Sequence, residues 1–170
     1  MAANRFKQAF ADRLSGWRDF SDKDLAALTD LALAQAQVES ADFSSNVFRN
    51  YNNAIGYKYY PGSIWQLSAG GMSPEGDRYA EYATVEDSAR ELADWIHRRA
   101  SSFAGIDSVY DYAVALKRHN YFGVTAEHYV NAMDSYYEQS ADYSALDGGS
   151  PWAGFFRRTG DSANRFLVLS

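Results

Sequence analysis

The amino-acid sequence predicts an α+β domain that is predominantly α-helical, in which two helical lobes flank a small β-hairpin. Three observations support this fold class. Apolar residues recur at helical spacing before residue 50 and again after residue 84. Between these stretches the helical pattern stops, and two short runs with strand character surround a loop rich in Gly, Ser and Pro. Two lobes beside a hairpin form a cleft, and clefts hold extended substrates.

The first lobe is predicted to contain two main helices. Residues 6–17 carry aromatic and leucine side chains at helical spacing, which predicts a short amphipathic helix. Ser21 and Asp24 have the spacing of a capping box, with Asp in place of the usual Glu. Behind them an Ala-rich apolar stripe predicts a long helix that runs to about Glu39. A turn begins at Ser40, and one short helix through Phe48 follows.

The hairpin is predicted from residues 64–67 and 79–82, which have strand composition. Residues 68–77 between them form the loop. Helices resume at Thr84, which begins a second capping box, and further caps are expected at Asp107 and Thr125. The helical pattern ends near residue 140. We therefore expect one domain over residues 1–140 and an extension over 141–170, which either packs on the domain or acts as a tail.

Composition excludes several classes of function. The net charge of −6 argues against a nucleic-acid partner, because phosphate contacts need a basic face. No apolar run reaches the length of a membrane span. The N-terminus lacks the apolar core of a signal peptide, so we expect synthesis in the cytoplasm. The chain has no cysteine, and its three histidines are scattered, so we predict neither a metal site nor a cofactor.

Glu39 is the carboxyl group most suited to acid chemistry. It ends an apolar helix beside Val38 and near Phe43. Desolvation there raises the pKa of a carboxyl group, and so does the negative end of the helix dipole. The alternative is a solvated Glu at a helix terminus, which position alone favours. A carboxylic acid held protonated supplies a proton to a leaving oxygen.

Four motifs appear in a fixed order along the chain. AQAQVES lies at residues 34–40, NNAIGYK at 52–58 and YAEYATVEDS at 79–88, and an Ala-Leu pair at 115–116 precedes Tyr121 and Tyr129. Together they resemble the glucosaminidase family of peptidoglycan hydrolases (glycoside hydrolase family 73) over roughly residues 20–138. The resemblance implies a lysozyme-like fold and a catalytic domain over residues 1–140. It also implies that Glu39 protonates the bond that is cut.

The resemblance is incomplete at the second catalytic group. The family often has a second carboxylate in the first strand region of the hairpin, whereas residues 64–67 offer none. Glu75, Asp77 or Glu81, later in the hairpin, are the candidates, with a solvated loop charge as the alternative for each. Tyr121 matches the tyrosine that the family places opposite the acid. It either stabilises the transition state, orients a water, or packs in the core.

Sugar-binding residues are expected among aromatic and amide side chains, because Tyr pairs an apolar ring with a hydroxyl group. Asn52 and Asn53 either bind sugar hydroxyl or acetamido groups or shape their turn. The aromatic side chains expected to line the cleft as a set are Tyr57, Tyr59, Tyr60, Trp65, Tyr82 and Tyr129, although Tyr129 alone favours packing.

The resemblance implies hydrolysis of the β-1,4 glycosidic bond after N-acetylglucosamine in the glycan strand of peptidoglycan. Two alternatives stay open. A lytic transglycosylase of the same fold needs only one carboxylate, although its usual Gly-Leu-Met-Gln segment is absent. A non-catalytic wall-binding or virion structural protein on the same fold is the other. We expect a monomer or a virion component that reaches the wall or periplasm as a phage lysis or virion-associated enzyme, with a secreted bacterial effector as the other route.

Overall fold

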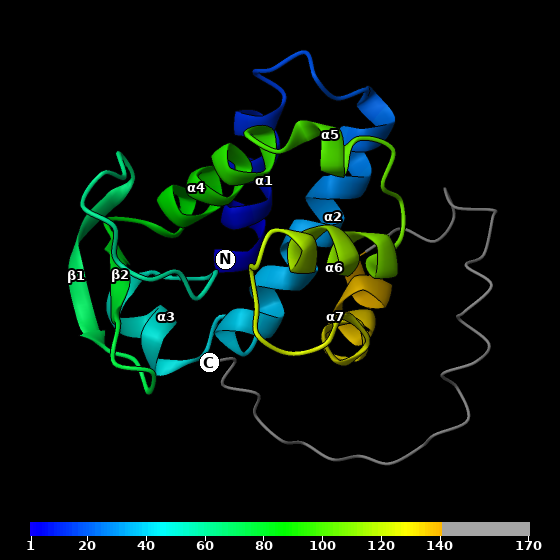
Figure 1. Ribbon diagram of the computed structural model, residues 1–170. Helices are drawn as coiled ribbons and strands as arrows, with labels where there is room; N and C mark the ends of the chain where they lie inside the picture. The colour runs from blue at the N-terminus through cyan, green and yellow to red at the C-terminus, as the bar shows by residue number, and fades with distance from the viewer. Residues whose placement is uncertain (141–170) are drawn as a thin grey trace.

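The structure is a computed structural model that describes residues 1–140, so the predicted extension at 141–170 lies outside the described residues. Seven helices and a two-stranded sheet make up the described part (Figure 1). Their bounds are α1 (Ala2–Leu14), α2 (Asp22–Ser40), α3 (Asn46–Tyr51), β1 (Gln66–Met72), β2 (Arg78–Tyr82), α4 (Val85–His97), α5 (Ala100–Phe103), α6 (Val109–Arg118) and α7 (Ala126–Ser140).

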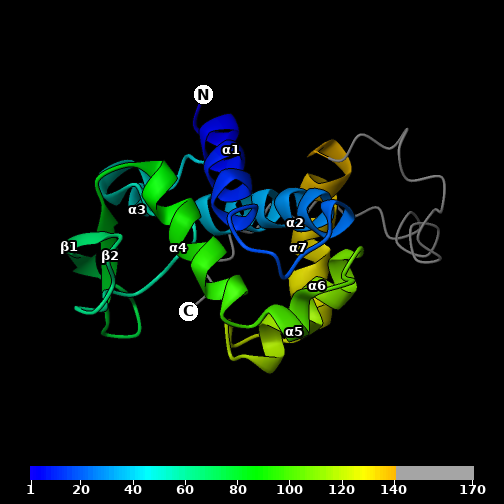
Figure 2. The same cartoon turned by 90° about the horizontal axis from the view of Figure 1, so that it is seen from above.

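Helix α2 is the centre of the helical body. Its capping box forms as predicted, with the Ser21 side chain bonded to the Asp24 amide and the Asp24 side chain bonded to the Ser21 amide. The helix packs against α1 and α7 (Figure 2). Because neighbours cover more than one side, its buried residues extend around the helix, and small Ala side chains let these neighbours approach closely. The buried aliphatic residues are Leu28, Leu31, Ala32, Leu33, Ala34 and Ala36.

The other helices pack around α2 and on one another. α1 buries Phe6, Phe10 and Leu14, and it packs on α4 as well as on α2. α6 packs on α7. The expected cap of α6 is wrong by one residue, because Ser108 caps the helix and Asp107 instead forms an ion pair with Lys23. The one-turn helix α5 has no clear apolar period in the sequence, and it was not predicted.

The hairpin is longer than predicted. β1 and β2 pair antiparallel, and β1 continues to Met72, into the segment expected as a loop. Gly70 and Gly71 explain this extension, because Tyr51 packs against both. A β-carbon would stand 3.0 Å from the Tyr51 ring at Gly70 and 2.7 Å from the Tyr51 hydroxyl oxygen at Gly71. These glycines therefore permit close packing within a strand, and the true turn shortens to residues 73–77.

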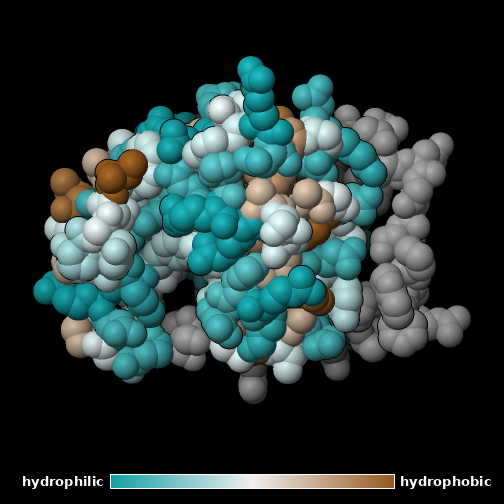
Figure 3. Space-filling model, turned by 45° about the horizontal axis from the view of Figure 1, so that its top comes forward, coloured by the Kyte–Doolittle hydropathy of each residue, from teal (hydrophilic) through white to brown (hydrophobic). Residues whose placement is uncertain are grey.

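The hairpin stands on one side of the helical body, next to α3 (Figures 1 and 2). Its exposed apolar side chains give this lobe hydrophobic surface (Figure 3). The predicted α+β class, with a helical body and a small hairpin, is confirmed. Within the described part of the chain, no helix has the length and apolar character that crossing a membrane requires.

Candidate active site

The turn after α2 places Glu39 in the last turn of that helix. Ala41, Asp42 and Phe43 all have left-handed backbones, with φ of 50°, 52° and 58°. A left-handed conformation costs a non-glycine residue about 1–2 kcal/mol. The buried hydroxyl group of Ser40 helps to hold this turn, because it donates to the Ala36 carbonyl at 2.6 Å and accepts from the Phe43 amide at 2.8 Å. The chain therefore keeps a strained turn directly behind the candidate acid.

Glu39 is held in a setting that favours its protonated form. Its side chain is half-buried, and the buried Tyr129 hydroxyl donates to Oε1 at 2.9 Å. Burial raises the pKa of Glu39 to about 7, although the Tyr129 hydrogen bond and the Lys58 charge both act to lower it. Desolvation dominates, as expected for a carboxyl group removed from water. At neutral pH a large fraction of Glu39 therefore carries a proton.

Tyr129 packs in the interior, the role that the sequence favoured for it. Its ring is fully buried between Phe122, at a centroid distance of 4.1 Å, and the acid. Burial and the Glu39 charge hold the pKa of Tyr129 well above its ordinary value, so its hydroxyl group stays a neutral donor. It contacts the acid and not the surface, where a sugar would bind.

The loop after α3 brings backbone against Glu39. The buried Asn53 side chain donates to the carbonyls of Tyr57 and Ala80 and accepts from two amides of its own loop. Asn53 therefore shapes the turn, and the sugar-binding alternative does not fit its burial. Gly56 has φ of +67°, and a β-carbon there would stand 3.0 Å from Glu39 Oε2. Any larger residue would crowd the carboxyl group and force it to shift.

Asn52 also has a structural role. It caps α3 with a left-handed backbone, and its side-chain amide donates to the carbonyls of Tyr82 and Ala83 at 3.1 and 3.2 Å. These bonds join α3 to the end of β2, which fixes the hairpin against the body.

A small pocket of about 180 Å³ opens at Glu39. Tyr121 and Tyr57 line it, with ring centroids 5.5 Å apart, and the Tyr121 hydroxyl donates to the Ile55 carbonyl at 3.0 Å. Among the described residues, the buried Tyr57 hydroxyl has no hydrogen-bond partner. Tyr121 therefore lies beside the acid, as the resemblance implies. The full lining is Glu39, Ile55, Gly56, Tyr57, Lys58, Tyr121 and Phe122.

Lys58 connects this pocket to the turn of the hairpin. Its ammonium group lies 2.8 Å from Glu75 Oε2 and 4.2 Å from the centroid of the Tyr79 ring. The hydrogen bond from Lys58 lowers the pKa of Glu75 to about 2. Glu75 is therefore an ionised carboxylate whose ion-pair partner lines the acid pocket.

The other predicted hairpin carboxylates are placed differently. Glu81 faces Ser68 across the sheet and accepts a hydrogen bond from its hydroxyl group. Asp77 is exposed, and its backbone carbonyl closes the turn by accepting from the Ser73 amide at 2.6 Å. Neither lines the pocket, which leaves Glu75 as the hairpin carboxylate linked to it.

Two of the predicted aromatic ligands are engaged elsewhere. Tyr82 is buried, and its hydroxyl group donates to Glu91 at 2.5 Å. The Trp65 indole donates to Asp94 at 2.8 Å, and its ring lies beside Arg13 and Arg90. Both side chains fasten the hairpin region to α4 and α1, so the structure does not bring them to the pocket.

Tyr59 and Tyr60 stay at the surface. Tyr59 is 38% exposed and Tyr60 is 65% exposed, in the segment that leads from the pocket to β1. These two tyrosines lie next to Lys58 in the sequence. Tyr57, on the other side of Lys58, lines the pocket.

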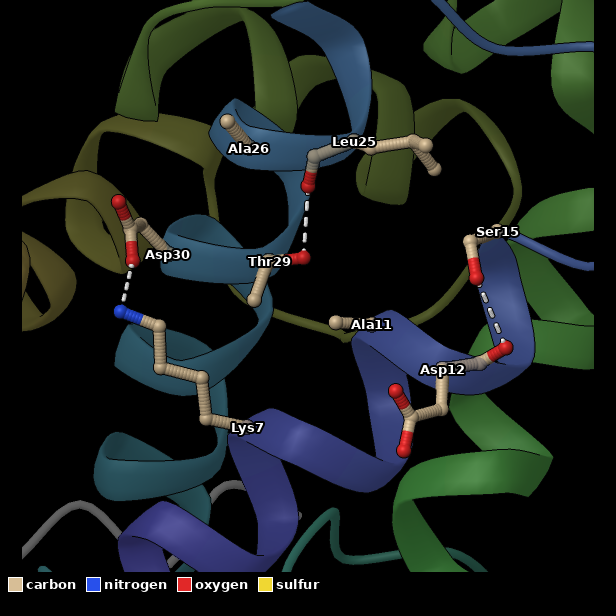
Figure 4. Close-up of a pocket in the computed structure, with 8 residues that line it drawn as sticks. All are labelled: Lys7, Ala11, Asp12, Ser15, Leu25, Ala26, Thr29 and Asp30. Atoms are coloured by element: carbon tan, nitrogen blue, oxygen red, sulfur yellow. Dashed lines mark hydrogen bonds and ion pairs between the residues drawn. The ribbon is translucent and has the colours of Figure 1, made fainter. Parts of the chain in front are cut away.

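A larger groove of about 380 Å³ lies between α1 and α2 (Figure 4). The Lys7–Asp30 ion pair at 2.7 Å crosses it, and Ser15 and Thr29 bond to carbonyls of their own helices. The ion pair joins α1 to α2, which is a structural role. Over residues 1–140, no three His, Asp or Glu side chains gather as metal ligands. We therefore place the site at Glu39.

Sequence reasoning missed three contributors to the site: Gly56, Lys58 and Phe122. The first two lie inside the NNAIGYK motif, so the motif itself was their signal. Phe122 had no signal, because its role is to stack on Tyr129 within the fold. The resulting arrangement places a carboxyl group with a raised pKa in the pocket and an ionised carboxylate at the hairpin turn, where it pairs with a lysine of the pocket lining.

Comparison with known proteins identifies the fold and the family. Two solved structures share the fold. One is a type VI secretion system effector–immunity complex from Pseudomonas protegens, with 18% identity, a TM-score of 0.56, and coverage of 82% of this chain and 94% of that chain. The other is the catalytic domain of the autolysin Auto from Listeria monocytogenes, with 16% identity, a TM-score of 0.53, and coverage of 82% of each chain. No curated protein sequence matches significantly.

The fold is therefore lysozyme-like, as the resemblance implied. The sequence profile of the glucosaminidase family, described as mannosyl-glycoprotein endo-beta-N-acetylglucosaminidase, matches residues 21–143, which is most of the chain. That match covers all four motifs and every residue of the Glu39 pocket. The chain belongs to the glucosaminidase family, and it is a glycoside hydrolase of the peptidoglycan-hydrolase type.

Proposed function

We propose that this domain hydrolyses the β-1,4 bond after N-acetylglucosamine in the glycan strand of peptidoglycan, with Glu39 as general acid and Glu75 as general base. The observation that carries the proposal is the Glu39 carboxyl group, whose pKa is raised to about 7 by burial. An acid with this pKa is protonated enough to donate and acidic enough to release its proton at neutral pH.

In the proposed step the oxygen of a water forms a bond to the anomeric carbon, and the bond from that carbon to the glycosidic oxygen breaks. Glu39 gives its proton to the departing oxygen, and the ionised Glu75 accepts a proton from the water. Tyr129 donates to the Glu39 carboxylate as it forms, at 2.9 Å, which stabilises the charge left behind. Solvent then returns the proton from Glu75 to Glu39.

The test is digestion of purified cell walls followed by mass spectrometry of the products. Reducing N-acetylglucosamine ends support the proposal. Ends of 1,6-anhydro-muramic acid contradict it in favour of a lytic transglycosylase, which needs only one carboxylate. If the wild type binds walls and releases nothing, the domain is a wall-binding protein.

Two variants locate the chemistry. Glu39→Gln is expected to abolish cleavage, and Glu75→Gln to lower kcat by about 100-fold, because general acid or base catalysis is worth about that factor. Glu127→Gln is the matched control, since Glu127 is exposed on the first turn of α7, and it is expected to keep wild-type activity. Full activity of Glu39→Gln would reject the assignment.

For delivery, we propose a phage lysis or virion-associated role. The effector route is the alternative, since one of the structures of the same fold is an effector–immunity complex. Finding the protein in purified virions would support the first route. Killing of neighbouring cells that requires contact and a secretion system would reject it in favour of the second.

A further inference from the structure

We propose that Lys58 is a positioning residue that ties the hairpin turn to the acid pocket and couples the charge of Glu75 to that of Glu39. The inference deepens the proposed function and rests on it for its catalytic meaning. The electrostatic effect of Lys58 on the two carboxyl groups does not depend on whether walls are cleaved.

The backbone fixes Lys58 at this junction. Residues 57–59 run beside β2, where the Tyr59 amide donates to the Arg78 carbonyl at 2.7 Å and the Ala80 amide donates to the Tyr57 carbonyl at 2.8 Å. Lys58 and Tyr79 are paired in this short bridge. These hydrogen bonds hold the backbone of Lys58 against β2, so the lysine cannot leave the hairpin without breaking them.

The side chain of Lys58 contacts one of the two carboxyl groups and lines the pocket of the other. Its ammonium group lies 2.8 Å from Glu75 Oε2, above the ring of Tyr79, and Lys58 also lines the pocket that contains Glu39. With 34% of its side chain exposed, Lys58 is better shielded than Lys23, whose side chain is 74% exposed in its ion pair with Asp107. Partial burial weakens screening by salt and strengthens each charge interaction.

Within residues 1–140, few groups act on either carboxyl group. Around Glu39 they are the Lys58 charge and two neutral hydroxyl groups, that of Tyr129 from α7 and that of Tyr121 from the loop after α6. Around Glu75 the charged neighbour is Lys58, with the Ser73 hydroxyl beside it. Lys58 is thus the formal positive charge that acts on both carboxyl groups, and removing it alters both at once.

The sign of the effect separates this proposal from a merely structural ion pair. Lys58→Met removes a positive charge, so the pKa of Glu75 is expected to rise from about 2 toward its ordinary 4.5. The pKa of Glu39 is expected to rise above 7 by roughly half a unit to one unit. Glu75→Gln breaks the same ion pair but removes a negative charge, so the pKa of Glu39 is expected to fall.

The experiment is a titration of side-chain carboxyl carbons by NMR, on the full chain labelled at glutamate. Lys58→Arg keeps the charge and is expected to leave both pKa values within a few tenths of the wild type. Lys23→Met breaks an exposed ion pair away from the pocket and is expected to change neither. Amide spectra report whether each variant is folded.

Opposite shifts of the Glu39 pKa in Lys58→Met and Glu75→Gln support the proposal. Shifts in the same direction, or no shift in either, overturn it. If Lys58→Met does not fold, Glu75→Gln decides alone, since an unchanged Glu39 pKa there also overturns it. If wild-type protein fails to cleave walls, the proposed function fails, and this titration still decides whether Lys58 couples the two groups.

Discussion

Glu39→Gln is expected to make the protein more stable at alkaline pH while removing its activity. In the unfolded chain Glu39 ionises near its ordinary pKa of 4.5, whereas burial holds the folded pKa at about 7. Between these values the folded state binds a proton that the unfolded state has lost, so stability falls as pH rises through this window. The difference corresponds to about 3 kcal/mol above pH 7, at about 1.4 kcal/mol per pKa unit.

Gln removes this penalty because it is neutral at every pH, and its carbonyl oxygen still accepts from Tyr129. Thermal unfolding at pH 8 is therefore expected to show a Tm raised by roughly 6–10 °C for a chain of this size. At pH 4 the two proteins are expected to unfold within about 1 °C of each other, since both states then hold the proton. Glu127→Gln serves as control, with a change below about 1 kcal/mol. Equal or lower stability of Glu39→Gln at pH 8 would refute desolvation as the cause of the raised pKa.

Three further substitutions test the surroundings of the acid. Tyr129→Phe removes the donor to Glu39, so the alkaline limb of the pH–activity profile should move up by about one pH unit, because a hydrogen bond to a charged group contributes about 1.5 kcal/mol; an unmoved limb counts against the contact. Gly56→Ala forces a β-carbon to 3.0 Å from Glu39 and should lower kcat/KM at least about tenfold. Gly105→Ala shares the positive φ but meets nothing within 4 Å, so equal activity losses in both would contradict this reasoning. Ala41→Gly relieves a left-handed backbone and should raise the free energy of unfolding by about 0.5–1 kcal/mol in urea titration, and a loss would show that the turn is unstrained.

The elements that the sequence predicted well are those with local signals. Caps and apolar spacing located α2 and α4, because a helix is determined by residues three and four apart. β1 was placed too short, since its two glycines have the composition of a loop. Their function is visible only when Tyr51, far along the chain, packs against them.

The site also has parts that local sequence signals predict and parts that they do not. Glu39 was found because an ordered set of motifs surrounds it. The contacts that set its chemistry join residues distant in sequence, such as Tyr129 to Glu39 across 90 positions. The spacing of apolar residues along the chain cannot predict a contact between two residues so far apart in sequence. Tyr82 and Trp65 were expected at the cleft because their residue types suit sugars, yet the fold uses their polar atoms to satisfy Glu91 and Asp94.

The most direct test of Glu39 as the acid is the pH dependence of kcat/KM on purified cell walls, measured for the wild type and for Glu39→Gln. The account predicts that wild-type activity falls above a pKa of about 7, and that Glu39→Gln has no measurable cleavage at any pH. An alkaline limb that persists at the same pH in an active Glu39→Gln protein would contradict it, because another group would then supply the proton.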